Sequence, residues 1–384
     1  MSSSIRTCPR VCTAVLLATC LAAPATAQTP AQSLDALWRS VCAQAQPGSP
    51  FFSRCQEILN AGPGSADRSS AAALGNNLGV VAAQGRMGDA PEESPTGGVA
   101  TESLIEQERW GIFASIHAGN LERDGSDNEA GFDADQFGAL LGFDYRFGNG
   151  VTGLLALEHR NQDADYDGGA GRLDQTGLGI RGSLYGTIGE NGGWLVSLGT
   201  EDIEFDIERR IAYALVLNAG TPEQTSVSIA GLAFAQPDGR QDSASVGFDW
   251  SWPREAWALR ASTGLDWQRL RIDAYAEREA GGLAFAFDEQ TVTSLQGHVG
   301  LEVSRVNSAS WGVWTPYARL DWFHEFRNDP RQIASRFVLD QAGVPVVFGT
   351  ESPDRSFGAV GAGVSGVFAG GWQAYAGISV TVAH

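Results

Sequence analysis

From Trp110 to the end of the chain, apolar and polar residues alternate with a period of two, and this pattern constrains the fold most. Successive side chains of a β-strand point to opposite faces, so such a period predicts strands. The stretch WGIFASIHAG places Trp110, Ile112 and Ile116 on one face, and QFGALLGFDYRF does the same from Phe137 to Phe147. The pattern recurs in VTGLLALEHR, TGLGIRGSLYGTI, WLVSLG, SASVGFDWSW, WALRASTGLDWQRL, SLQGHVGLEVS, WGVWTPYARLDWFHEF, FGAVGAGVSGVF and WQAYAGISVTVAH. The sequence therefore predicts an all-β fold of about eleven strands.

The two faces of these strands differ in chemistry. One face carries Leu, Val, Phe and Trp, whereas the other carries charged residues among many Gly and Ser. A soluble sandwich also alternates, but these strands are long and their aromatic residues gather at strand ends. We therefore expect a membrane barrel with an apolar outer face and a polar lumen. The predicted lumen-facing residues are Glu158, Arg160, Arg181, Arg260, Asp266, Arg319, Asp321 and Glu325.

Connections between the predicted strands alternate in length. Short ones cover residues 148–150, 189–193, 253–256, 306–310 and 369–371. Long ones cover residues 120–132, 161–172, 205–241, 273–289 and 326–356. Short periplasmic turns opposite long extracellular loops are typical of barrels in the outer membrane of Gram-negative bacteria. The pattern predicts a transmembrane antiparallel up-and-down β-barrel in that membrane.

Residues 1–27 have the composition of a secretory signal peptide. Arg6 and Arg10 precede the apolar stretch VCTAVLLATCLAA, and small residues end at Ala27 before Gln28. No later stretch offers about 18 consecutive apolar residues, so we expect no helical membrane span. The sequence predicts an exported protein.

Residues 28–106 differ from the remainder and predict a short helical segment followed by a linker. SLDALWRSVCAQAQ, FFSRCQEILNA, AAALGNNLGVVAAQGRM and ATESLIEQERW have helical spacing, and GDAPEESPTGGVA has linker composition. Cys42 and Cys55 remain after signal removal, and we expect a disulfide worth about 3 kcal/mol. Metal binding would need further ligands, and no His lies near them. The predicted domains are a passenger or plug over 28–106 and a barrel over 107–384.

The net charge of -19 indicates which partners to expect. It provides no basic stripe for phosphates, which argues against nucleic acid as a partner. The predicted outer-membrane barrel leads us to expect outer-membrane lipid and lipopolysaccharide as partners. None of the five His residues (117, 159, 298, 324 and 384) belongs to a recognisable nucleophile motif, so we expect neither catalysis nor an organic cofactor.

One acidic stretch, DADYDGGAGRLD, resembles a calcium loop in its spacing. Asp163, Asp165, Asp167 and Asp174 occupy positions 1, 3, 5 and 12 of such a loop. However, Asp replaces the usual bidentate Glu, and strands rather than helices flank the stretch. An acidic extracellular loop without metal is the favoured interpretation, with calcium as the alternative.

Three stretches resemble landmarks of the autotransporter (type V secretion) β-domain. They are DIERRI (206–211), IDAYAEREAGGLAFAFDEQTVTSLQGHVGLEVS (272–304) and TPYARLDWFHEF (315–326). The resemblance covers about residues 107 to 384. It implies a barrel of about twelve strands, threaded by a helix, which the barrel-assembly machinery inserts and which helps to export an N-terminal passenger.

The resemblance predicts a function, whereas the number of predicted strands is difficult to reconcile with a closed barrel. We expect a translocator that exports or displays its own short N-terminal segment; a standalone channel or structural barrel plugged by that segment is the alternative.

The predicted strands number eleven, and an odd number would place the first and last strands parallel, which such barrels avoid. We therefore expect either a C-terminal shortening by one strand or a further strand within 332–349.

Overall fold

The structure is a computed structural model of the whole chain. It describes residues 45–47, 51–52, 55, 102–106, 109–123, 131–147, 150–189, 191–217, 225–309, 312–327, 332–349, 355–368 and 373–382. Among these residues, no helix is long and apolar enough to cross a membrane. The predicted signal peptide, Cys42, the predicted linker and Trp372 lie outside the described residues.

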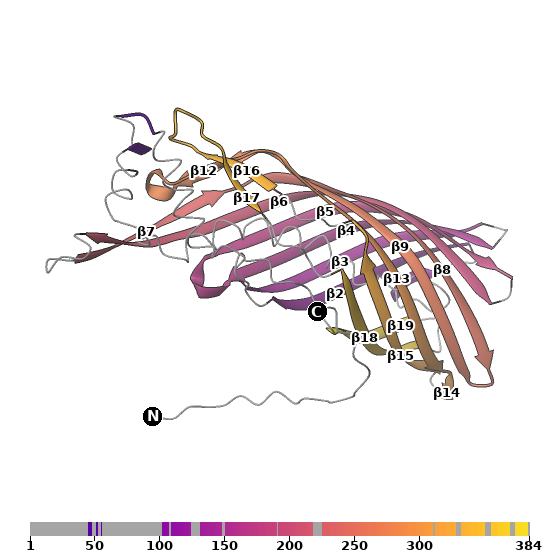
Figure 1. The fold of residues 1–384 in the computed structure, drawn as a ribbon. Coiled ribbons are helices and arrows are strands. Elements are labelled where there is room, and N and C mark those ends of the chain that lie inside the picture. Colours follow the sequence, from indigo (N-terminus) through magenta and orange to yellow (C-terminus); the bar gives the residue numbers. More distant parts are fainter. Residues whose placement is uncertain are drawn as a thin grey trace, which may run out of the picture.

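One continuous antiparallel sheet dominates the molecule (Figure 1), and its path contains twelve strands. In path order these are β1 (Glu102–Glu106), β2 (Trp110–Arg123), β3 (Phe132–Arg146), β4 (Val151–Tyr166), β5 (Gly171–Ile188), β6 (Gly192–Leu217), β8 (Asp238–Arg254), β9 (Trp257–Ile272), β13 (Gln290–Arg305), β15 (Gly312–Glu325), β18 (Ser356–Phe368) and β19 (Gln373–Val382). Strands next to each other in the chain pair with each other, apart from short strands in some connections, which confirms the predicted up-and-down order.

The predicted alternation of short and long connections holds with one exception, because only residues 167–170 join β4 to β5 at the edge where long connections were expected. Short turns join β3 to β4, β5 to β6, β8 to β9 and β18 to β19, and β14 (Asn307–Ala309) forms a tight hairpin with β15. We call this edge the turn end. The other edge, which we call the loop end, carries the connections between β2 and β3, β6 and β8, β9 and β13, and β15 and β18, all of which are longer. The predicted apolar face is exposed, with Leu141, Leu157, Leu178 and Trp322 each more than half accessible.

The twelfth strand comes from before Trp110. We predicted a helix for ATESLIEQERW, but β1 pairs with β2 from Glu102↔Ala114 to Glu106↔Gly111, so that prediction is wrong. Five residues are too few for periodicity to separate strand from helix. β1 and β19 lie beside each other at the two ends of the path. Because strand direction alternates along the path of twelve strands, β1 and β19 are antiparallel. The strand that makes the number even therefore comes from the N-terminal side and not from residues 332–349.

Residues 332–349 do not supply a barrel strand. They form β16 (Gln332–Phe337) and β17 (Val346–Gly349), which join β10 (Tyr275–Ala276) and β12 (Phe285–Phe287) in a separate four-stranded sheet. Figure 1 shows β12, β16 and β17 at the loop end, near β7 (Thr225–Ala235). The prediction of a further strand there is therefore wrong in its placement.

Several predicted loops are extensions of the sheet. β4 and β5 extend until the turn η1 (Asp167–Gly169) joins them. β6 extends to Leu217, and β7 pairs with this extension from Ile207↔Ala235 to Leu217↔Thr225. In β6 the buried Ile203, Phe205 and Ile207 alternate with acidic residues that face outward. A cluster of buried side chains forms there on the inner face: Phe132, Ala134, Ala164, Tyr166, Leu173, Ile203, Phe205, Ile207, Ala235, Leu270, Ile272 and Val292.

Candidate functional site

The predicted lumen residues lie on the less exposed face of the sheet, where most of them form ion pairs between strands. Arg181 on β5 contacts Glu158 on β4, with Nε 2.5 Å from Oε1. Arg160 on β4 pairs with Glu201 on β6, with Nε 3.2 Å from Oε1. These side chains are 8–21% exposed, so the surrounding sheet shields the pairs from bulk water.

Two further pairs continue this polar face around the sheet. Arg260 on β9 lies 3.3 Å from Asp249 on β8. His298 Nδ1 on β13 lies 3.4 Å from Asp266 Oδ2 on β9. Asp249, like Glu201, was not among the predicted site residues. Its parity on the strand places it on the polar face, but only the cross-strand register reveals which charge it meets.

On β15 the predicted residues have two different roles. Arg319 and Asp321 are two residues apart on one face and pair at 2.7 Å. Glu325 is 1% exposed. It accepts a hydrogen bond from the Ser294 hydroxyl at 2.5 Å and from the backbone N–H groups of Leu295 and Arg327 at 3.0 Å each. Those bonds join the loop end of β15 to β13, so the role of Glu325 is structural.

Polarity on this face changes from the middle of the barrel towards the loop end. Along β4, alternate residues run from Glu158 and Arg160 through Gln162 to Ala164 and Tyr166. The last three are buried. Charged groups therefore lie in the middle of the sheet, and apolar side chains fill its inner face at the loop end.

The predicted calcium residues lie on the β4–η1–β5 hairpin. Asp163 pairs with Asp174 across the ladder, and Asp165 faces Arg172. The Arg172 guanidinium lies 2.6 Å from Asp174 and 3.9 Å from Asp163. Burial, followed by the charge of Asp174, raises the pKa of Asp163 above its ordinary range. Within the described ranges no group of three or more acidic, His or Cys side chains is close enough to hold a metal. Calcium binding stays the untested alternative to an acidic loop without metal.

One serine–histidine contact lies on the apolar face. His324 Nδ1 is 2.8 Å from the Ser356 hydroxyl, beside an open groove of about 570 Å³ lined by Phe248, Leu265 and Trp322. The His324 ring contacts Trp322 and Phe326. Among the described residues its Nε2 atom has no acidic or amide partner, so the third group of a catalytic triad is missing from this part of the structure.

The small sheet at the loop end, together with its neighbours, forms a packed unit that we call the cradle: β10, β12, β16, β17, the turn η2 (Ala280–Gly282), and Ile211 and Ala233 of β6 and β7. Arg209 and Glu277 form a buried ion pair inside it, at 2.7 and 2.5 Å. Glu277 also accepts a bond from the backbone N–H of Phe285 at 2.8 Å. The sequence did not predict this pair, because Arg209 belongs to β6 and Glu277 follows β10, 68 residues later in the chain.

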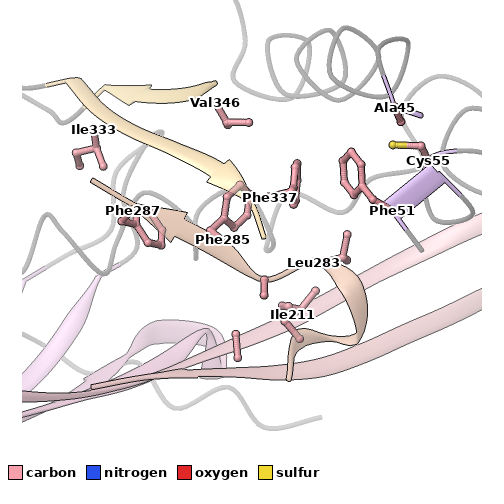
Figure 2. Packing of buried hydrophobic residues seen from close by; sticks show 13 residues of the cluster. Ala45, Phe51, Cys55, Ile211, Leu283, Phe285, Phe287, Ile333, Phe337 and Val346 are labelled. Atoms are coloured by element: carbon pink, nitrogen blue, oxygen red, sulfur yellow. The ribbon is translucent and has the colours of Figure 1, made fainter. Parts of the chain in front are cut away.

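Residues from the N-terminal segment complete the cradle (Figure 2). Phe51 and Cys55, both helical, are 0% exposed, and Ala45 is also buried. The rings of Phe51 and Phe337 are 4.5 Å apart between centroids. Cys55 is in a disulfide. Its predicted partner Cys42 lies outside the described residues, so the pairing stays a prediction.

Comparison with known proteins adds a family and a fold. The family described as "Autotransporter beta-domain" matches residues 112–379. The translocator domain of the autotransporter NalP from Neisseria meningitidis is similar in structure, with a TM-score of 0.55 at 15% identity over 82% of this chain and 94% of that one. The β-domain of the Bordetella autotransporter BrkA gives a TM-score of 0.50 at 16% identity over 72% and 93%. The search of curated proteins gave no match.

Proposed function

The chain belongs to the autotransporter β-domain family, whose barrels lie in the outer membrane of Gram-negative bacteria, and we propose that this barrel assists the export and surface display of its own N-terminal segment, residues 28–106. The segment would follow a signal peptide of residues 1–27 and precede a barrel that begins near residue 107. The barrel-assembly machinery would insert the barrel, and outer-membrane lipid and lipopolysaccharide would surround it.

The proposed mechanism is physical rather than covalent. Exposed apolar side chains on the outer face stabilise the barrel in lipid, and the strand ladder satisfies backbone groups that lipid cannot. The paired charges Glu158–Arg181 and Arg160–Glu201 would line a hydrated lumen at mid-barrel. Because each charge already has a partner, a passing polypeptide meets no strong fixed charge that would hold it.

One observation carries the proposal: Phe51 and Cys55 are buried at the loop end. Barrels of this type keep short turns in the periplasm and long loops outside. In that orientation the described part of the N-terminal segment would lie on the side that faces the cell exterior, which a displayed segment requires. This placement supports display over the alternative, a standalone channel or structural barrel plugged by the same segment.

Protease treatment of intact cells tests this proposal. Carrying an epitope tag before Ala45, the protein should lose the tag to external protease while the barrel stays intact. A tag that survives in intact cells but is lost in lysed cells would contradict surface display. If, in addition, deletion of residues 28–90 produced ion conductance in planar bilayers, the plugged channel would be favoured.

A further inference from the structure

The cradle has an aromatic surface that residues of the N-terminal segment contact. Phe285 and Phe337 lie with their ring centroids 4.3 Å apart, and Phe51 packs on Phe337 from the other side. Figure 2 shows Phe51 and Cys55 entering from the N-terminal segment opposite the strands that bear Phe285 and Phe337. Phe51 is therefore one of the contacts that bury the Phe337 ring.

The surface is fixed by contacts that do not involve the segment. Glu277 holds the backbone N–H of Phe285, and the Arg209 guanidinium lies over the Phe285 ring at 5.4 Å from its centroid. Arg209 also donates to the carbonyl oxygen of Leu283 at 3.1 Å. Because Arg209 belongs to β6, these bonds tie the cradle to a strand of the barrel.

We propose that the cradle is a retention site: it holds the N-terminal segment noncovalently through Ala45, Phe51 and Cys55, so that the segment stays on the cell after the connecting chain is cut. The inference rests on the proposed function, since the segment must reach the loop end to bind there. It adds a named binding surface and a named occupant. Complete burial of Phe51 and Cys55 distinguishes a bound segment from one that merely passes the loops.

For the experiment, the recognition sequence of a site-specific protease is inserted within residues 88–100, the predicted linker, and an epitope tag is inserted before Ala45. Intact cells are treated with the protease and washed, and the tag is measured on cells and in the supernatant. The unaltered cradle should keep the tag on the cells. Phe337→Ala should release it about 100-fold faster, because removing a ring from a packed core typically costs on the order of 10²-fold or more in an equilibrium constant.

A neighbouring residue provides the matched control. Phe337 is 2% exposed whereas Val338 is 45% exposed, so Val338→Ala should release the tag at the unaltered rate. Phe51→Ala should behave like Phe337→Ala, since the two rings form one contact. Heat-modifiable migration of each variant in gels verifies that its barrel is folded.

The outcomes separate the retention site from the proposed function. A tag that external antibody cannot reach before cleavage overturns display and retention together. A tag that is accessible, but that washes off cells carrying the unaltered cradle after cleavage, overturns retention alone. Equal release from Phe337→Ala and Val338→Ala also overturns the assignment to this surface.

Discussion

At the scale of single residues, the Arg209–Glu277 pair is a buried ion pair that joins the cradle to β6. Both side chains are 3% exposed or less. A buried pair contributes little relative to apolar residues, but removing one partner leaves an uncompensated charge and costs about 3–5 kcal/mol. We therefore expect Arg209→Met to destabilise the cradle by that amount, while Arg209→Met combined with Glu277→Gln recovers much of the loss.

Limited proteolysis of the purified barrel in detergent measures this effect, with cleavage between residues 273 and 349 as the readout. Arg336→Met is the matched control, because Arg336 pairs with Asp288 at 3.4 Å while both side chains are more than half exposed. Exposed pairs contribute about 0.5 kcal/mol. A cleavage rate for Arg209→Met no higher than that for Arg336→Met would show that the buried pair does not hold the cradle together.

At the scale of elements, alternation predicted the long strands and their order because neighbours in the chain pair with each other and the pleat fixes which face is apolar. Alternation did not predict β1, which is five residues long, or the two-residue β10. It also failed where acidic residues dominate: Asp202, Glu204 and Asp206 gave β6 the composition of a loop, although Ile203 and Phe205 kept the period. Partners such as Glu201 and Asp249 follow from register, which no local pattern contains.

The β4–η1–β5 hairpin gives a prediction about calcium. If Asp163 and Asp174 bind calcium, titration calorimetry at millimolar calcium should give heat that Asp163→Asn abolishes and Asp202→Asn leaves unchanged. Metal ligands must be deprotonated, and the pKa of Asp163 is raised above 3.8. Binding should therefore weaken as the pH falls through that raised pKa, before an ordinary Asp would protonate. Absence of heat would leave the hairpin as an acidic loop, the interpretation we favoured from the sequence.

The hairpin's own contacts explain why binding would be weak. Arg172 already lies against Asp174, and the positive charge of a guanidinium opposes a cation at the same carboxylates. Arg172→Gln should therefore tighten calcium binding if the site exists. Unchanged affinity in this variant would mean that calcium binds elsewhere.

At the scale of the whole molecule, the even strand number depends on β1. Eleven strands lie between β2 and β19 inclusive, so β2 and β19 run in the same direction. Addition of β1 makes the terminal strands β1 and β19, which run in opposite directions and lie side by side. Unpaired backbone groups within lipid cost several kcal/mol each, so a barrel that lacks this strand would be left with open edges. The short segment before Trp110 thus links the N-terminal region to the closure of the barrel.

Proline substitution tests this dependence, because proline removes a backbone N–H and is poorly tolerated inside a sheet. We expect Ser103→Pro combined with Ile105→Pro to abolish the heat-modifiable, detergent-resistant form of the barrel, whereas Ser103→Ala combined with Ile105→Ala should retain it. The alanine pair keeps every backbone donor, so the comparison isolates the ladder between Ser103↔Phe113 and Ile105↔Ile112. Retention of the folded form by the proline variant would show that β2 and β19 close the barrel without β1, and the two ends of the sheet would then have to pair in parallel.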